Sequence, residues 1–370
     1  MGSVKVNDIA KVTQGGKLKL SGKHFVKDGY PAYGAGGLNG YLPDYEFDCP
    51  AVILSANGAR CGKCFYVDGK WSSLANTQVI IPDTEKIIPK FLWYQLNDEN
   101  KWHKAGTAQP FIKPSDVKNR IVKKPNFEEQ KEIVRILENS EDLRQKRKEQ
   151  LALLDDYLKS VFLDMFGDPI INEKGLPQMS LGEVSSDIKY GTNMKCFERN
   201  EKNSTPVLRI PNIYKGNIDL ADLKYAELDE KEFNKLLLRK GDLLFVRTNG
   251  NPDYIGRCAV FNLDKDYVNA SYLIRVRLRE NAKLLSSFIC YIVSLPSYRS
   301  KIAKESRTTA GNYNINTQGL KNLKILQPSV ESQKKFLSVA YRVEQAKQKM
   351  RASLNEMDNH FNALMQRYFG

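Results

Sequence analysis

Two long stretches of the chain repeat apolar residues at helical spacing. In the second stretch these positions are Phe336, Ala340, Val343, Met350, Leu354, Met357, Phe361, Leu364 and Tyr368. The first stretch has Ile133, Leu137, Leu151, Leu154, Leu158, Val161 and Met165 at the matching places. Intervals of three, four or seven residues form the seam of a coiled coil, so each stretch predicts a helix of about 40 residues, roughly 60 Å long. The alternative is two unrelated amphipathic helices, each packed on its own domain.

The two predicted helices belong to a longer internal repeat. "VKNRIVKKPNFEEQ" (residues 117–130) matches "LKNLKILQPSVESQ" (residues 320–333), and the same offset holds without a gap from about residue 107 to residue 167. Pro125 and Pro328 precede the helices, followed by Asn or Ser, which is typical of a helix start. Similarity is weaker upstream, where "VNDIAKVTQG" resembles "LGEVSSDIKYG", "VILSANG" resembles "LLFVRTNG" and "GKC" resembles "GRC". Each repeat is therefore a divergent globular region followed by a better-preserved helix.

The short link between the repeats restricts how the helices can pair. Residues 167–177, "GDPIINEKGLP", reach roughly 36 Å when fully extended. Such a link cannot return about 60 Å to the start of a parallel partner helix. The sequence therefore predicts antiparallel helices with a globular region at each end and pseudo-twofold symmetry, as in a dimer fused into one chain.

The globular regions alternate short β-like runs with turns rich in Gly, Asn and Pro. "AVILSANG", "KCFYV" and "NTQVIIP" predict strands in the first region, and "GDLLFVRTNG", "RCAVF" and "YLIRVRL" predict strands in the second. Helical runs are few, at "IPKFLWYQLN" and "LLSSFICYIVSLPSYRSKIA". The predicted fold class is α+β, with mainly β globular regions. The alternating "RVRLR" (residues 275–279) has two interpretations, a strand face along phosphates or a solvated face.

The predicted seam is interrupted by polar residues near the middle of each helix. Ser140, Arg144 and Arg147 occupy seam positions in the first copy, and Lys347 does so in the second. Arg144, Arg147 and Lys347 are therefore candidate contacts for another protein. In the alternative interpretation, these long side chains extend to solvent.

Composition points to a polyanionic partner and gives little sign of catalysis. The net charge of +14 favours nucleic acid, although charge alone is weak evidence. Neither a membrane-spanning run nor a signal peptide is evident, so a soluble, cytoplasmic protein is expected. The six cysteines are too sparse for a disulfide framework. The pair Cys61 and Cys64 lacks the second pair that zinc would need, so no metal and no cofactor are expected.

Taken in order, these features resemble the specificity subunit of type I restriction-modification enzymes over nearly the whole chain. The resemblance rests on "GYPAYGAGGLNGYL", on "GDLLFVRTNGNPDYIGRCAVF" and on the two exits "IKPSDVKNRIVKKPNFEEQKEIVRIL" and "INTQGLKNLKILQPSVESQKKFL". It implies target-recognition domains at 1–125 and 178–328, spacer helices at 126–166 and 329–370, and a linker at 167–177. It also implies double-stranded DNA, two methyltransferase subunits and restriction (nuclease-translocase) subunits as partners, and no catalysis by this chain.

Candidate DNA contacts are loop residues at equivalent places in the two repeats. Major-groove reading uses Arg, Lys, Asn and Gln, and phosphates attract Lys and Arg. The first region offers Ser55, Asn57, Arg60, Lys63, Lys104, Thr107 and Gln109. The second offers Arg247, Asn249, Asn251, Tyr254, Arg257, Arg307, Thr308, Asn312, Tyr313 and Asn314. Any one of them could instead be a solvated or turn-forming residue.

Two other functions remain open from the sequence. "NPDY" (residues 251–254) is close to the Asn-Pro-Pro-Tyr motif of adenine methyltransferases, but a single-chain methyltransferase also needs a nucleotide-binding βαβ unit. "GAGG" at residue 34 has no evident strand before it, so it predicts a turn instead. The other possibility is a coiled-coil scaffold that holds two protein-binding domains.

Overall fold

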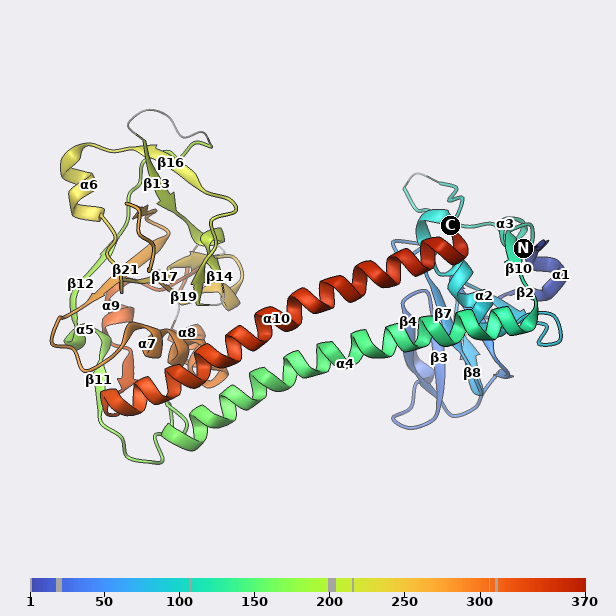
Figure 1. The fold of residues 1–370 in the computed structure, drawn as a ribbon, viewed down its shortest axis with the longest axis horizontal. Helices are drawn as coiled ribbons and strands as arrows, with labels where there is room; N and C mark the ends of the chain where they lie inside the picture. Colours follow the sequence, from blue (N-terminus) through green and yellow to red (C-terminus); the bar gives the residue numbers. More distant parts are fainter. Residues whose placement is uncertain are drawn as a thin grey trace. The chain divides into compact units, whose positions relative to one another are not determined.

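The computed structural model describes residues 2–17, 22–106, 108–198, 204–214, 216–305, 307–309 and 312–370. The chain divides into two compact units (Figure 1). Unit 1 comprises residues 1–149 and 351–370, and unit 2 comprises residues 150–350. Both long helices, α4 (Phe127–Phe166) and α10 (Val330–Phe369), contribute residues to each unit. The domain boundaries expected from the sequence stay predictions.

Unit 1 is built around an antiparallel sheet with the strand order β2-β9-β6-β7. Its elements before α4 are β1 (Gly2–Lys5), α1 (Val6–Ile9), β2 (Ala10–Gln14), η1 (Gly22–His24), β3 (Tyr30–Gly34), β4 (Gly37–Leu42), β5 (Phe47–Asp48), β6 (Ala51–Ser55), β7 (Cys64–Val67), β8 (Lys70–Ser73), β9 (Thr77–Pro82), α2 (Pro89–Leu96), η2 (Glu99–Lys101), α3 (Pro114–Lys118) and β10 (Ile121–Lys124). A second sheet, β4-β3-β8-β5, contributes the buried Trp71 to a core shared with Val79 and Ile53. The three strands and the helix predicted for this region are confirmed.

Unit 2 repeats the central sheet, with the order β12-β21-β17-β19. Its elements between the long helices are β11 (Gln178–Ser180), α5 (Leu181–Val184), β12 (Ser185–Tyr190), β13 (Ser204–Leu208), η3 (Ile210–Asn212), β14 (Ile213–Tyr214), β15 (Asn217–Ile218), β16 (Lys224–Glu227), α6 (Glu230–Leu236), β17 (Leu243–Val246), β18 (Thr248–Asn249), η4 (Pro252–Tyr254), β19 (Cys258–Val260), β20 (Val268–Asn269), β21 (Leu273–Leu278), α7 (Ser286–Ser294), α8 (Pro296–Glu305), β22 (Arg307–Thr309), β23 (Asn312–Asn314), α9 (Thr317–Lys321) and β24 (Lys324–Leu326). The predicted strands are again confirmed. The single predicted helical run is two helices, α7 and α8, because Pro296 follows α7 and begins α8.

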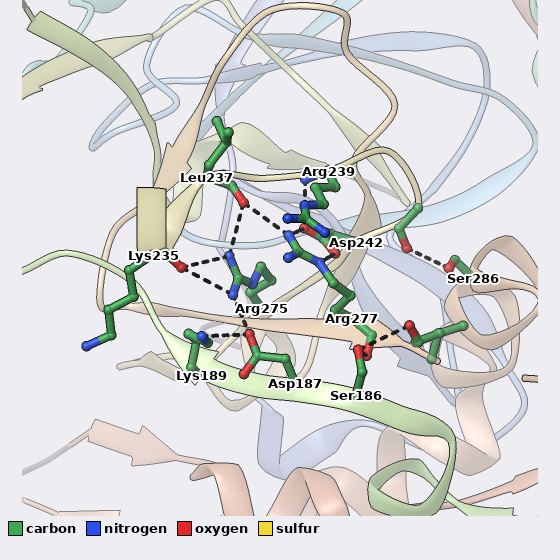
Figure 2. A network of polar contacts seen from close by, with 12 residues as sticks. Ser186, Asp187, Lys189, Lys235, Leu237, Arg239, Asp242, Arg275, Arg277 and Ser286 are labelled. Atoms are coloured by element: carbon green, nitrogen blue, oxygen red, sulfur yellow. Dashed lines mark hydrogen bonds and ion pairs between the residues drawn. The ribbon is translucent and has the colours of Figure 1, made fainter. Parts of the chain in front are cut away.

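Arg275 and Arg277 of strand β21 are held by carboxylates within unit 2, so both interpretations of "RVRLR" are wrong for these two, whereas Arg279 at the end of the run is exposed. Arg275 is 1% exposed and pairs with Asp187, while its other nitrogen donates to the carbonyl of Leu237 at 3.1 Å. Arg277 donates twice to the buried Asp242, at 2.8 and 2.7 Å. Figure 2 shows both guanidinium groups held among these carboxylates and the carbonyls that follow α6. These arginines stabilise unit 2 internally.

The repeated join has the same hydrogen bonds in both units. Gln130 is fully buried on the first turn of α4, where it donates to the carbonyl of Pro125 and accepts from the amide of Ile88 at 2.8 Å. Gln333 does the same in α10, with the carbonyl of Pro328 and the amide of Leu285 at 2.9 Å. One glutamine thus fixes the helix to the segment that begins α2 in unit 1 and α7 in unit 2.

Side chains before each helix satisfy its first amide groups. Asn126 and Glu129 form a reciprocal capping box at α4, and Ser329 accepts from the amide of Ser332 at α10. The helix starts predicted from the Pro-Asn and Pro-Ser pairs are therefore confirmed.

Within each unit the two long helices pair antiparallel, as the link length predicts. In unit 1, Ile133 and Leu137 of α4 share a core with Leu364 near the end of α10. In unit 2, Phe162 near the end of α4 packs on Phe336 near the start of α10, with ring centroids 5.3 Å apart. In the same unit, α7 contributes Phe288 to this core (Figure 1).

The polar interruptions of the seam form two matching ion pairs. In unit 1, Nε of Arg144 lies 2.6 Å from a carboxylate oxygen of Asp358. In unit 2, Lys347 pairs with Asp155. Arg144 and Lys347 occupy the same place in the repeat, and so do Asp155 and Asp358. In each unit the cation of one helix therefore meets the aspartate of the other, which is the reciprocal pattern of a twofold interface.

Candidate nucleic-acid interface

The two units support their candidate loops on the same hydrogen-bonded framework. In unit 1 the amide of Ser55 donates to the carbonyl of Lys63 at 2.8 Å, and in unit 2 the amide of Val246 donates to the carbonyl of Arg257 at 2.8 Å. In the reverse direction, the amide of Gly62 donates to the carbonyl of Ser55 at 2.9 Å, and the amide of Gly256 donates to the carbonyl of Val246 at 2.8 Å. Both glycines have positive φ, at 98° and 68°. A residue with a side chain would be strained in this backbone conformation.

This framework corrects the residue matching taken from "SANG" and "RTNG". The amide of Ile112 donates to the carbonyl of Ala56 at 3.0 Å, and the amide of Ile315 donates to the carbonyl of Arg247 at 3.0 Å. Ala56 is therefore equivalent to Arg247, and Asn57 is equivalent to Thr248. The loop that follows is longer in unit 2, and this length difference hides the shift in the sequence.

In unit 1 the structure brings the two predicted loop segments together. Asn57 and Phe111 form a β-bridge, and the amide of Gly58 donates to the carbonyl of Pro110 at 3.0 Å. Arg60, Lys63, Lys104 and Gln109 are exposed and Asn57 is half-buried. Ser55 is 0% exposed, so it cannot contact DNA in this conformation.

Two of the exposed cations in unit 1 already have contacts. Arg60 donates to the carbonyl of Gly36 at 2.8 Å, and Lys63 lies 5.9 Å from the ring centroid of Phe65. Thr107 lies outside the described residues.

In unit 2 the predicted segments form a small sheet with the order β18-β23-β22. Asn249 pairs with Tyr313, and Asn314 pairs with both Thr248 and Arg307. The side chains of Arg307, Thr308 and Asn312 lie outside what the structure describes. The backbone therefore brings the candidate segments of unit 2 together as well, while their contact with DNA stays a prediction.

The loop between β18 and β19 forms a compact basic cluster. The Arg257 guanidinium stacks on Tyr254 at 3.5 Å, and its Nε donates to the carbonyl of Asp253 at 2.9 Å. Arg299 of α8 donates to the same carbonyl, and burial together with the neighbouring Arg257 lowers the pKa of its guanidinium. Asn251 accepts from the amide of Asp253 and caps η4, so "NPDY" is a turn at this place. Two arginines side by side create a local positive potential suited to phosphate.

Arg247, directly before β18, is half-buried. Its guanidinium lies 4.6 Å from the ring centroid of Tyr190 and donates weakly to the carbonyl of Ser271. A stacked, planar arginine keeps its remaining donors in a fixed direction, as base recognition requires.

The candidate partner residues have neighbours within the chain. Arg144 also lies 4.5 Å from the ring centroid of Phe361, and Lys347 is 8% exposed, so this lysine does not extend to solvent. Arg147 is half-buried. Their contact with another protein stays a prediction.

Neither a cluster of metal-ligating side chains nor a helix suited to span a membrane occurs in the part of the chain that the structure describes. No group of three or more His, Cys, Asp and Glu there could hold a metal ion. Cys61 and Cys64 are buried, free thiols, and burial raises the pKa of each. Among the same residues, no helix combines the length and apolarity needed to cross a bilayer.

The fold defines a class of protein in which two units share one framework, and each is joined to a long helix in the same way. A family model described as "Type I restriction modification DNA specificity domain" matches residues 1–153 and 174–356. The chain belongs to this family.

Individual relatives agree with this assignment. The chain is 25% identical over 302 residues to the type I restriction enzyme MjaVIII specificity subunit of Methanocaldococcus jannaschii, covering 76% of this chain and 69% of the relative. It is 30% identical over 171 residues to the EcoKI specificity subunit of Escherichia coli K12. That match spans 45% of this chain and only 35% of the relative.

Solved structures show the same fold. The S subunit of a type I restriction-modification system from M. genitalium matches with a TM-score of 0.61 at 15% identity, covering 100% of this chain and 96% of the other. A chain from a study of complex assembly in the type I system matches with a TM-score of 0.58 at 17% identity, covering 100% of this chain and 97% of the other.

Proposed function

We propose that this chain is the non-catalytic specificity subunit of a type I restriction-modification system. Each unit reads one part of a split, asymmetric DNA site, and the chain brings methyltransferase subunits to that site in the cytoplasm. The observation that carries the proposal is the shared framework with different loops. A common framework presents loops in the same way, while different loop residues read different bases.

The chemistry of the loops supports DNA as the ligand. In a chain of net charge +14, the candidate loops of unit 1 carry exposed Lys and Arg with Asn57, and those of unit 2 carry the half-buried Arg257 beside Tyr254. Lys and Arg neutralise phosphates, and Asn, Gln and Arg match base edges in the major groove. The single-chain methyltransferase has less support, because the central sheet in each unit is antiparallel and not a doubly wound parallel sheet.

Two copies of one partner would dock on the long helices. Residues 141–146 read "EDLRQK" in α4, and residues 344–349 read "EQAKQK" at the matching place in α10. Gln145, Lys146, Gln348 and Lys349 are exposed, so folding does not explain why both copies have them. A repeated exposed surface fits two identical methyltransferase subunits. Restriction subunits would join this assembly.

Methylation mapping of the assembled complex tests the main proposal. The complex is formed with the methyltransferase subunits of the same system, and methylated adenines are mapped on random DNA. We expect one split motif with a fixed gap. Replacing residues 1–125 with the equivalent region of a relative should change one half of the motif and leave the gap unchanged.

The same experiment separates the rival functions. Methylation by the purified chain with S-adenosylmethionine alone would support the single-chain enzyme. A complex without salt-sensitive DNA binding would support the scaffold. A swap that changed both halves of the motif would contradict independent reading by the two units.

Charge reversal tests the docking surface. The variant Lys146→Glu should lower the number of methyltransferase subunits bound from two to one, and Lys146→Glu with Lys349→Glu should abolish binding. Lys159 is also exposed on α4 but has Asn362 at its matching place, so Lys159→Glu is the control. Mass photometry of each mixture gives the stoichiometry. Two subunits bound to the double variant would rule out this surface.

A further inference from the structure

We propose that Asn76 in unit 1 and Tyr272 in unit 2 contact the bases of their respective half-sites. Neither residue was among the candidate contacts identified from the sequence. The inference rests on the proposed function and adds one position that both units use for recognition with different chemistry.

The two residues occupy the same place on the common framework. The amide of Ala56 donates to the carbonyl of Asn76 at 2.9 Å, and the amide of Arg247 donates to the carbonyl of Tyr272 at 3.0 Å. Each residue comes directly before a strand of the central sheet, β9 or β21. The sheet therefore holds each one beside the loop that contains the candidate contacts.

Both residues are exposed while the residues that follow them are buried. Tyr272 is 57% exposed and Asn76 is also exposed, whereas Thr77 and Leu273 are 1% and 0% exposed. Folding does not require a large aromatic ring in solvent at this place. The side chain at this position is free to differ between the units, as a reading position requires.

The backbone and side chain of Asn76 are fixed in a way that suits base recognition. Its φ is 65°, in the left-handed region, where asparagine is tolerated better than most residues. Its side-chain oxygen accepts a hydrogen bond from Asn57 Nδ2 at 3.1 Å. This bond orients two amides beside each other, and an amide can donate to and accept from the major-groove edge of adenine.

Tyr272 offers a ring in place of an amide. It lies between Ser271, whose carbonyl accepts from Arg247, and the start of β21. The backbone carbonyl of Tyr272 accepts from the amide of Arg247, the arginine that Tyr190 already fixes by stacking at 4.6 Å. An exposed ring on a residue bonded to a fixed arginine suits apolar contact with a thymine methyl group together with a hydrogen bond to guanine.

Substitutions within the full chain, assembled with its methyltransferase subunits, test the inference. Asn76→Gly keeps a backbone that accepts positive φ and removes the amide, and Asn76→Asp keeps the shape but removes the donor. Tyr272→Phe removes the hydroxyl, and Tyr272→Ala also removes the ring. Tyr157 on α4 is 53% exposed, so Tyr157→Ala is the control for losing an exposed tyrosine.

The readout is base preference at each position of both half-sites, from methylation of a randomised DNA library. The Asn76 variants should change preference in one half-site only, and Tyr272→Ala in the other only, by about fivefold to a hundredfold at the affected position. Tyr157→Ala should change neither.

The possible negative results have different meanings. If the wild-type complex shows no split motif, the proposed function itself fails. If the wild type shows the motif and Asn76→Gly and Tyr272→Ala keep it unchanged, only this inference is overturned. Melting temperature of each variant, measured first, distinguishes lost recognition from lost folding, and Asn76→Asp and Tyr272→Phe provide milder substitutions where the first choice unfolds.

Discussion

One face of the central sheet packs in an apolar core in unit 1, whereas in unit 2 it carries Asp242, Arg275 and Arg277 beside apolar residues such as Leu244. Strand pairing makes Val79 equivalent to Arg275, and Ala51 equivalent to Asp242. In unit 1 this face packs under Trp71 of the second sheet. In unit 2 it meets the carbonyl of Leu237, directly after α6, which guanidinium groups can satisfy and apolar side chains cannot. The same framework thus accepts either apolar or charged side chains on this face. The element that covers the face determines which kind is needed.

The largest expected effect comes from removing the ion pair between Arg277 and Asp242 in unit 2. Arg277→Ala leaves Asp242 buried at 1% exposure without its bidentate partner, which should lower the free energy of unfolding by about 3–5 kcal/mol. Urea denaturation followed by hydrogen exchange in unit 2 measures the loss.

The double variant Arg277→Ile with Asp242→Ala sharpens this prediction. It copies the apolar pair Ile81 and Ala51 of unit 1, and should recover more than half of the lost stability because Asp242 is no longer present as a buried charge without its partner. Equal losses in the single and double variants would show that the two faces are not interchangeable.

A smaller effect on stability is expected at the join, where both units have the same glutamine hydrogen bonds. Gln130→Leu and Gln333→Leu each leave buried backbone groups without a partner, at about 1–3 kcal/mol for each group. Gln333 also donates to the carbonyl of Lys283, so its replacement should cost more. Faster hydrogen exchange at Ile88 or at Leu285 checks each variant. Unchanged exchange would mean that water replaces the side chain.

A comparable effect is expected for DNA binding by the loops. Arg257→Ala should weaken binding by about 1–3 kcal/mol if the arginine contacts a base, with specificity relaxed in one half-site. If it contacts phosphate, all sequences should weaken alike and the salt slope should fall by about one. Lys63→Ala is the matched variant in unit 1. Unchanged affinity across a salt titration would remove Arg257 from the interface.

The smallest effect concerns pH. Burial acts to raise the pKa of Asp187, but hydrogen bonds from Lys189 and Arg275 outweigh it and lower the pKa. A carboxylate with a lowered pKa adds stability above its unfolded value, near about 3.9, and this stability is lost as the pH falls through the folded value. The stability difference between wild type and Asp187→Asn should therefore shrink between pH 6 and pH 3. A constant difference would contradict the ion pair.

Local and repeated features of the fold could be predicted from the sequence. The strands, the helix starts and the antiparallel pairing follow from periodicity, capping residues and link length. Gln130 and Gln333 are visible as a repeated identity, but their burial is not.

Features that depend on contacts distant in sequence could not be predicted. "RVRLR" looks solvated until Asp187 and Asp242 are brought beside it, and the one-residue shift between "SANG" and "RTNG" appears only in strand pairing. Asn76 and Tyr272 look like ordinary loop residues because the sheet alone places them next to the candidate contacts.

The buried glutamine at each join also limits how far the direction of its long helix can vary. A helix of 40 residues is about 60 Å long, so a change of 10° in its direction at the first turn would move its last turn by about 10 Å. That is roughly the length of three base pairs of DNA. A few hydrogen bonds from one side chain thus fix the direction of a long helix at its first turn, so a small error at the join becomes a large displacement at the other end of the helix.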